Sequence, residues 1–156
     1  MAITSAICNS FKVEILTGTH NFTASSGNTF KLALYSSNSA TLSKSTTAWA
    51  AASDPTADPT DTYEVTTTGS GYTSGGNSLT STTPALSGDT ACCLFASTSW
   101  GSTASFTARG CLIYNSSASN KAVCVVNFGS DKTVTTGTFT VEFPAQTAGN
   151  AIIQIA

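Results

Sequence analysis

The chain has 156 residues, of which only 14 are charged, and its formal net charge at pH 7 is −2. Nucleic acid and anionic membrane surfaces both need a basic face on their partner, so neither is expected to bind here. No apolar run is long enough to cross a bilayer. Thr and Ser (28 and 23 residues) make up about a third of the chain, whereas His20 is the single histidine and Arg109 the single arginine. Acid–base and nucleophilic catalysis need titratable groups near neutral pH, so the composition favours a non-enzymatic protein without a cofactor.

The first predicted element is a helix over residues 4–17, with Thr4 or Ser5 as its cap. Apolar residues recur at every fourth position and form one stripe: Ile3, Ile7, Phe11 and Ile15, widened by Cys8 and Leu16. Glu14 is predicted to face away from this stripe. Gly18 stands where a glycine commonly ends a helix.

Short strands separated by turn residues are predicted for the rest of the chain. Their ranges are 29–35, 63–67, 79–83, 90–96, 104–109, 110–115, 121–128, 138–143 and 150–155. This pattern predicts one domain over residues 1–156, mainly β, in which an antiparallel sandwich over 28–156 packs against the helix.

One hairpin can be registered from the sequence. If the polar loop between 110–115 and 120–125 is symmetric, Cys111 lies opposite Cys124. Two facing thiols could oxidise, but two small core residues are the favoured interpretation. The chain start lacks the pattern of a signal peptide, which also favours free, buried thiols. No C-x-x-C occurs in the chain, so we expect no metal site.

The segment 36–62 differs from the strands around it. It is rich in Ser, Thr and Ala around Trp49, and it contains two Asp-Pro turns. A loop of this length is usually functional or mobile. Half of the acidic residues lie here or just beyond, at Asp54, Asp58, Asp61 and Glu64. Their spacing lacks the pattern of a calcium loop, so a solvated acidic turn is expected.

Several isolated side chains are candidates for a site. His20 could act as a base or ligand, but its neighbours offer no carboxylate, and a contact with the end of the helix or a place in a turn is favoured. Trp49, Tyr63 and Tyr72 could stack on sugars or anchor a protein partner. For Trp49, local packing and a partner contact are equally weighted. Arg109 is expected to pair with a carboxylate, within the chain in preference to across a subunit interface.

Certain segments resemble a group of small structural proteins of tailed phages. One is Phe-Lys-Leu-Ala-Leu-Tyr at 30–35. The others are 6–16 with His20 and Phe22, 40–42, 71–73, 75–76, 108–110, 112–115, 120–123, 128–129 and 139–141. The resemblance covers nearly the whole chain, although the stretch 49–61 is longer and richer in Asp-Pro than the family pattern.

The resemblance implies a virion component, and among such proteins a head decoration (cement) protein is the favoured placement. It would bind the major capsid protein on the head exterior, associate with copies of itself, including as a trimer, and assemble in the host cytoplasm. No catalytic residue carries over. Residues Trp49, Tyr63, Tyr72 and Arg109 are the candidate partner contacts. The alternative is a tail- or fibre-associated module that contacts other virion proteins or host glycans. A small hydrolase built on His20 has the least support.

Overall fold

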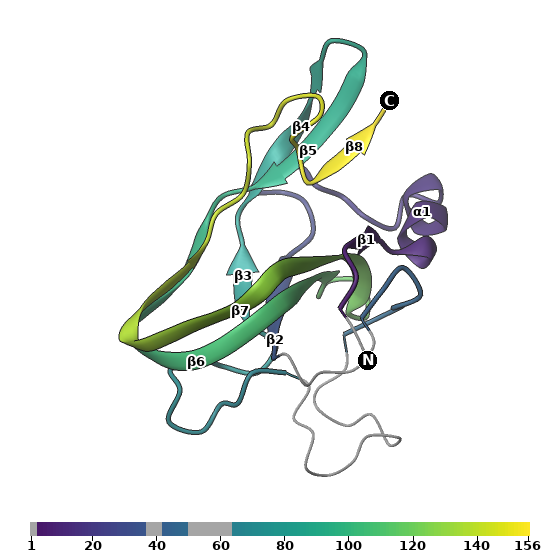
Figure 1. The fold of residues 1–156 in the computed structure, drawn as a ribbon. Coiled ribbons are helices and arrows are strands. Elements are labelled where there is room, and N and C mark those ends of the chain that lie inside the picture. The colour runs from purple at the N-terminus through teal and green to yellow at the C-terminus, as the bar shows by residue number, and fades with distance from the viewer. Residues whose placement is uncertain (1–2, 37–41, 50–63) are drawn as a thin grey trace.

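The computed structural model describes residues 3–36, 42–49 and 64–156, and Figure 1 shows their arrangement. The elements in chain order are β1 (Ala6–Ile7), α1 (Asn9–Leu16), β2 (Phe30–Tyr35), β3 (Asn77–Leu79), β4 (Ser81–Ser87), β5 (Thr90–Phe95), β6 (Thr98–Asn115), β7 (Lys121–Val141) and β8 (Ile153–Ile155). The predicted mainly-β fold with one helix and antiparallel sheets is confirmed.

Two sheets share one hydrophobic core. The larger has the order β1-β7-β6-β2-β3, and the smaller, which we call the arm, has the order β4-β5-β8. The long hairpin of β6 and β7 crosses the molecule, and the arm stands above it (Figure 1). The predicted strands 104–109 and 110–115 are parts of β6, which continues through four irregularities in its pairing with β7. Such bulges bend a strand without ending it.

Aromatic rings fill the core between the sheets. Phe22 and Phe30 stack with their centroids 4.3 Å apart, and Phe95 of the arm lies 5.5 Å from Phe30. Trp100 is 4% exposed and packs on Phe106. The arm is therefore attached to the main sheet through its own apolar face.

The predicted helix over 4–17 is wrong at its start. Ala6 and Ile7 form β1, paired with β7, and the N–H of Cys8 donates to the carbonyl of Val123 at 3.0 Å. The backbone groups of residues 6–8 thus form hydrogen bonds with the exposed edge of β7, whereas in a longer helix they would have bonded within the helix. Cys8, and not Thr4 or Ser5, is the N-cap, and it makes no side-chain capping bond.

The predicted end of the helix is confirmed. Gly18 has a φ of +70°, and its N–H donates to the carbonyl of Ile15 at 3.2 Å. The N–H of Thr19 donates to the carbonyl of Glu14 at 3.0 Å. These two bonds form a Schellman motif, which turns the chain back sharply and carries residue 20 underneath the helix.

The predicted faces of the helix are partly wrong. Phe11 is buried as expected, but Leu16 is 87% exposed and Val13 is 63% exposed. Glu14 instead points toward the body of the protein, where its side chain is 13% exposed. The predicted apolar stripe does not run along the whole helix, because Ile3 and Ile7 lie before the helix begins.

The predicted register of the β6–β7 hairpin is also wrong. Cys111 lies opposite Val126, and Cys124 lies opposite Ile113. The loop has five residues, 116–120, two of them with positive φ, and an irregularity beyond Ile113 adds one more residue to β7. Together they shift the pairing away from the symmetric register. All five cysteines are free and buried, as favoured from the sequence.

Candidate functional site

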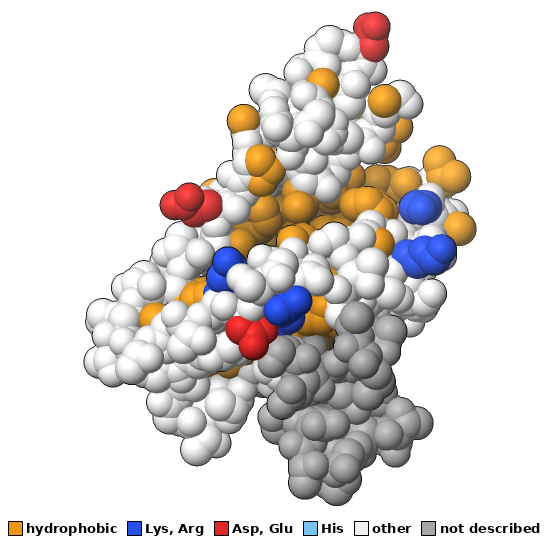
Figure 2. Space-filling view, viewed as in Figure 1, with side chains coloured by type: hydrophobic (Ala, Val, Ile, Leu, Met, Phe, Trp, Pro, Cys, Tyr) orange, Lys and Arg blue, Asp and Glu red, His pale blue; other side chains and the backbone are white. Residues whose placement is uncertain are grey.

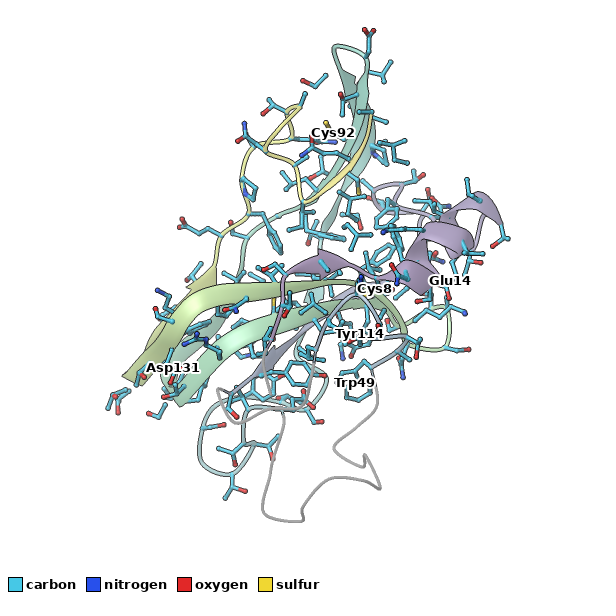
Figure 3. All side chains as sticks on the ribbon, turned by 45° about the vertical axis from the view of Figure 1, so that its right-hand side comes forward. Cys8, Glu14, Trp49, Cys92, Tyr114 and Asp131 are labelled. Carbon is cyan, nitrogen blue, oxygen red and sulfur yellow. The ribbon has the colours of Figure 1, made fainter. Side chains whose placement is uncertain are left out.

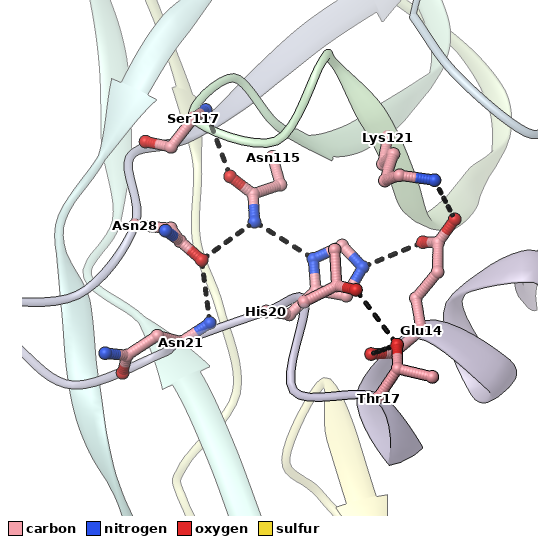
Figure 4. Close-up of polar contacts among 9 residues, drawn as sticks. Glu14, Thr17, His20, Asn21, Asn28, Asn115, Ser117 and Lys121 are labelled. Atoms are coloured by element: carbon pink, nitrogen blue, oxygen red, sulfur yellow. Dashed lines mark hydrogen bonds and ion pairs between the residues drawn. The ribbon is translucent and has the colours of Figure 1, made fainter.

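A buried polar cluster joins α1 to the tip of the β6–β7 hairpin (Figure 4). The imidazole of His20 lies between two partners: its Nε2 is 2.8 Å from Oε2 of Glu14, and its Nδ1 is 3.0 Å from Nδ2 of Asn115. The amide of Asn115 also donates to Oδ1 of Asn28 at 3.0 Å. Since Nδ1 faces an N–H donor, Nδ1 is the acceptor and Nε2 carries the proton that Glu14 accepts.

Glu14 connects this cluster to a lysine. Nζ of Lys121 donates to Oε1 of Glu14 at 2.7 Å. Burial opposes ionisation of Glu14, but the hydrogen bonds from Lys121 and His20 and their charges outweigh it and lower the pKa of this carboxyl below its usual value. The carboxylate is therefore ionised at neutral pH and holds the helix to the hairpin.

This geometry bears on the hydrolase hypothesis. The structure does bring a carboxylate to His20, one that sequence reasoning missed because it looked only at adjacent residues. The second nitrogen of the ring, where a nucleophile would lie, is occupied by the amide of Asn115. Among the described residues, His20 therefore links the helix to the β6–β7 hairpin through hydrogen bonds with Glu14 and Asn115. The signal that could have identified Glu14 is its place one turn before the helix-ending Gly18.

A buried carboxylate, that of Glu64, organises the opposite end of β2. Glu64 is 7% exposed. Its Oε1 accepts hydrogen bonds from the hydroxyl of Tyr72 and the N–H of Gly75, both at 2.6 Å, and its Oε2 accepts one from Ser74 at 3.1 Å. The expected solvated acidic turn is wrong for Glu64, because donors of the 70–75 loop replace water around it. Asp54, Asp58 and Asp61 lie outside the described residues.

Tyrosines surround this carboxylate and remain protonated. Burial, and then the charge of Glu64, raise the pKa of Tyr72 and of Tyr35 well above the usual tyrosine value. The same two causes raise the pKa of Tyr114 to about 12. The hydroxyl of Tyr72 also accepts from the N–H of Leu34 at 3.0 Å. The cluster therefore ties the loop to β2 by hydrogen bonds from neutral donors.

The structure separates the four predicted partner contacts. Tyr72 is 3% exposed, so its prediction as a partner contact is wrong: the ring belongs to the core. Trp49 is half-buried and stacks on Tyr114 with the centroids 5.2 Å apart, which is the local packing alternative (Figure 3). Arg109 pairs with Asp131 of the same chain at 3.4 Å, as favoured. Tyr63 lies outside the described residues.

Among the described residues the exposed large apolar side chains lie in two places, neither of which was a candidate site from the sequence. Val13 and Leu16 project from α1, and Leu86 and Ile155, which are 75% and 57% exposed, lie on the arm. Figure 2 shows apolar side chains gathered in the hollow between the arm and the main sheet, and further ones on the arm and beside the helix. Contiguous exposed apolar surface of this kind marks interaction sites.

A pocket of about 360 Å³ opens on the outer part of β7. It is lined by the apolar residues Phe128, Phe139 and Val141 and by the charged residues Lys132 and Glu142, with Thr140. A second, more polar pocket of about 230 Å³ lies between residues 23–29 and 79–81. Neither pocket contains His20 or Glu64, although Asn28 of the His20 cluster lines the second pocket.

The comparisons with known proteins add no family. No protein-family model, characterised protein or solved structure matches the chain. In the described ranges no group of His, Cys, Asp and Glu is arranged to hold a metal ion. No helix in those ranges has the length and apolar character needed to cross a membrane.

Proposed function

We propose that the protein is a non-enzymatic structural component of a tailed-phage virion that decorates the outside of the head. The observation that carries this proposal is the pair of uncovered apolar surfaces on α1 and the arm, on a molecule with very few charges. Two of its buried titratable side chains, His20 and Glu64, form hydrogen bonds within the chain that hold the helix and a loop in place. A rigid β-body with apolar contact surfaces suits lattice binding, and the sequence resemblance points to the same class.

The mechanism would be stabilisation by mass action. A protein that binds only across neighbouring subunits of the assembled shell favours the assembled state by its binding free energy. Internal DNA pressure pushes capsid subunits apart, and a bound decoration protein opposes that separation. Such binding needs no catalysis, and a low net charge leaves little electrostatic repulsion between many copies on one surface.

Binding to purified heads tests the proposal. We expect the protein to co-sediment with expanded heads of its own phage in saturable amounts, in hundreds of copies per head, and to delay their release of DNA on heating. Electron-microscopic labelling should mark the faces of the head. Labelling of the tail tip would favour the tail or fibre alternative instead. Failure to bind either expanded heads or isolated capsomers would refute the decoration role.

A further inference from the structure

The outer face of α1 has no cover within the chain. Phe11 and Ile15 point toward the core, whereas Val13 and Leu16, three residues apart, share the opposite side of the helix. A surface helix normally carries polar residues on that side, and a helix that is apolar on both sides is normally buried. The outer face of α1 is therefore built like an interface.

The arm ends in a matching surface. Leu86 of β4 lies opposite Ala91 of β5, and Ala91 lies opposite Ile155 of β8. Directly paired residues share one face of a sheet, so the three form a row, which we call the arm row. Two residues along β5 from Ala91, Cys93 points the same way and is 6% exposed in the core. The arm row thus continues the core face of the arm beyond the part that the main body covers.

Opposite charges accompany the two surfaces. Lys12 is exposed on α1, and the carbonyl of Lys44 accepts from the N–H of Asn9 at the start of the helix. Asp89 is exposed in the turn between β4 and β5, beyond Leu86. None of these three charges makes an ion pair with another described residue. Figure 2 shows the basic groups beside the helix and an acidic group at the tip of the arm.

From this complementarity we propose that the outer face of α1 docks on the arm row of a second copy of this chain. The contact is heterologous: Val13 and Leu16 of one copy pack on Leu86, Ala91 and Ile155 of the next. A symmetric helix-to-helix contact would bring the lysines of both copies together, and an arm-to-arm contact would bring two copies of Asp89 together. Head-to-tail docking instead places lysine beside aspartate, and it closes into a ring when the rotation between copies allows.

The inference does not depend on binding to heads, because it concerns the isolated protein. Sedimentation of the purified full chain across the micromolar range should show reversible association above the size of one chain. The double variants Val13→Ser/Leu16→Ser and Leu86→Ser/Ile155→Ser should each raise the dissociation constant at least about tenfold, as expected for truncating central interface residues. Lys132→Ala, far along the β6–β7 hairpin, is the matched control and should leave it unchanged.

A charge exchange tests the orientation without touching the apolar residues. Lys12→Glu and Asp89→Lys should each weaken association, and the variant carrying both changes should regain most of the lost affinity. These exposed positions leave the fold intact, which circular dichroism checks. Equal loss in the single variants with no recovery in the double variant would overturn the head-to-tail arrangement.

Mixing provides an independent readout. The helix variant keeps an intact arm row, and the arm variant keeps an intact helix face, so an equimolar mixture should form a dimer that cannot extend. A symmetric helix-to-helix or arm-to-arm interface would give no recovery on mixing. Monomeric wild-type protein throughout the concentration range, or association unchanged in both double variants, would overturn the proposal. Loss of self-association with retained head binding would separate this inference from the proposed function.

Discussion

Tyr72→Phe is the sharpest test of the buried Glu64 cluster. The change removes one oxygen and leaves the ring in place against Trp100 and Phe106, whose centroids lie 5.9 and 6.0 Å away. Two hydrogen bonds disappear with that oxygen: the bond donated to Glu64 and the bond accepted from the N–H of Leu34.

The magnitude follows from the two lost partners. A hydrogen bond to a charged group contributes about 1.5–3 kcal/mol. The N–H of Leu34, a fully buried residue, is left without its acceptor, and an unsatisfied buried donor costs about 1–3 kcal/mol. We therefore expect Tyr72→Phe to lower the free energy of unfolding by about 3–5 kcal/mol. Because this is a large share of the stability of a domain this size, the variant should also unfold at a much lower temperature.

Tyr114→Phe is the matched control. The hydroxyl of Tyr114 donates a single bond to the neutral carbonyl of Gly75 at 2.9 Å, so the same substitution should cost about 1 kcal/mol. Urea unfolding followed by tryptophan fluorescence measures both variants. If Tyr72→Phe destabilises the protein no more than Tyr114→Phe does, the charge-assisted cluster does not stabilise the fold as described.

Three further predictions concern separate parts of the molecule. Hydrogen bonds lower the folded-state pKa of Glu14, so its ionised form stabilises the protein at pH values above the unfolded pKa of about 4.3, and this contribution is lost as the pH falls through the lower folded-state pKa. Glu14→Gln should therefore flatten the acid side of a curve of stability against pH. An unchanged curve would contradict a stabilising role for the contacts of Glu14 with Lys121 and His20. Gly76→Ala should prevent folding or lower the melting temperature severely, because Gly76 has a φ of +68° and an added Cβ would lie 1.7 Å from the carbonyl oxygen of Leu32. A soluble variant with an unchanged melting temperature would show that the strand carrying Leu32 can move aside. Burial raises the pKa of Cys111 to about 12, so this thiol should resist alkylation at pH 8 in the native protein and react after unfolding in urea. Mass spectrometry measures the alkylation. Rapid labelling of the native protein would mean that the core opens.

Local patterns in the sequence were enough for individual elements. The strand predicted over 29–35 is β2, in which Phe30, Leu32 and Leu34 are fully buried and Ala33 on the other face is buried as well. Gly18 predicted the end of the helix, because the left-handed conformation there suits glycine. The place of His20 just after the helix end, between neighbours without a carboxylate, favoured a helix contact or a turn residue over a catalytic site.

Longer-range relations escaped the sequence because they depend on pairing and bulges. Ala6 and Ile7 pair with the edge of β7 as a strand, so the helix begins later than predicted. A five-residue loop and one added residue beyond Ile113 moved Cys111 away from Cys124. Neither change alters the composition or the apolar pattern, so no sequence signal marked them.

The amino-acid sequence by itself determined a mainly-β protein with one helix, buried thiols and few charges, since these follow from composition and from apolar spacing along the chain. Only the tertiary structure decided which polar residues are internal and which apolar residues are left uncovered. Glu64 became buried and Glu14 half-buried because donors from distant segments lie beside them, and Leu16 and Ile155 stayed exposed because nothing in the described chain reaches them. Burial depends on what the fold brings alongside a residue, which local spacing does not encode.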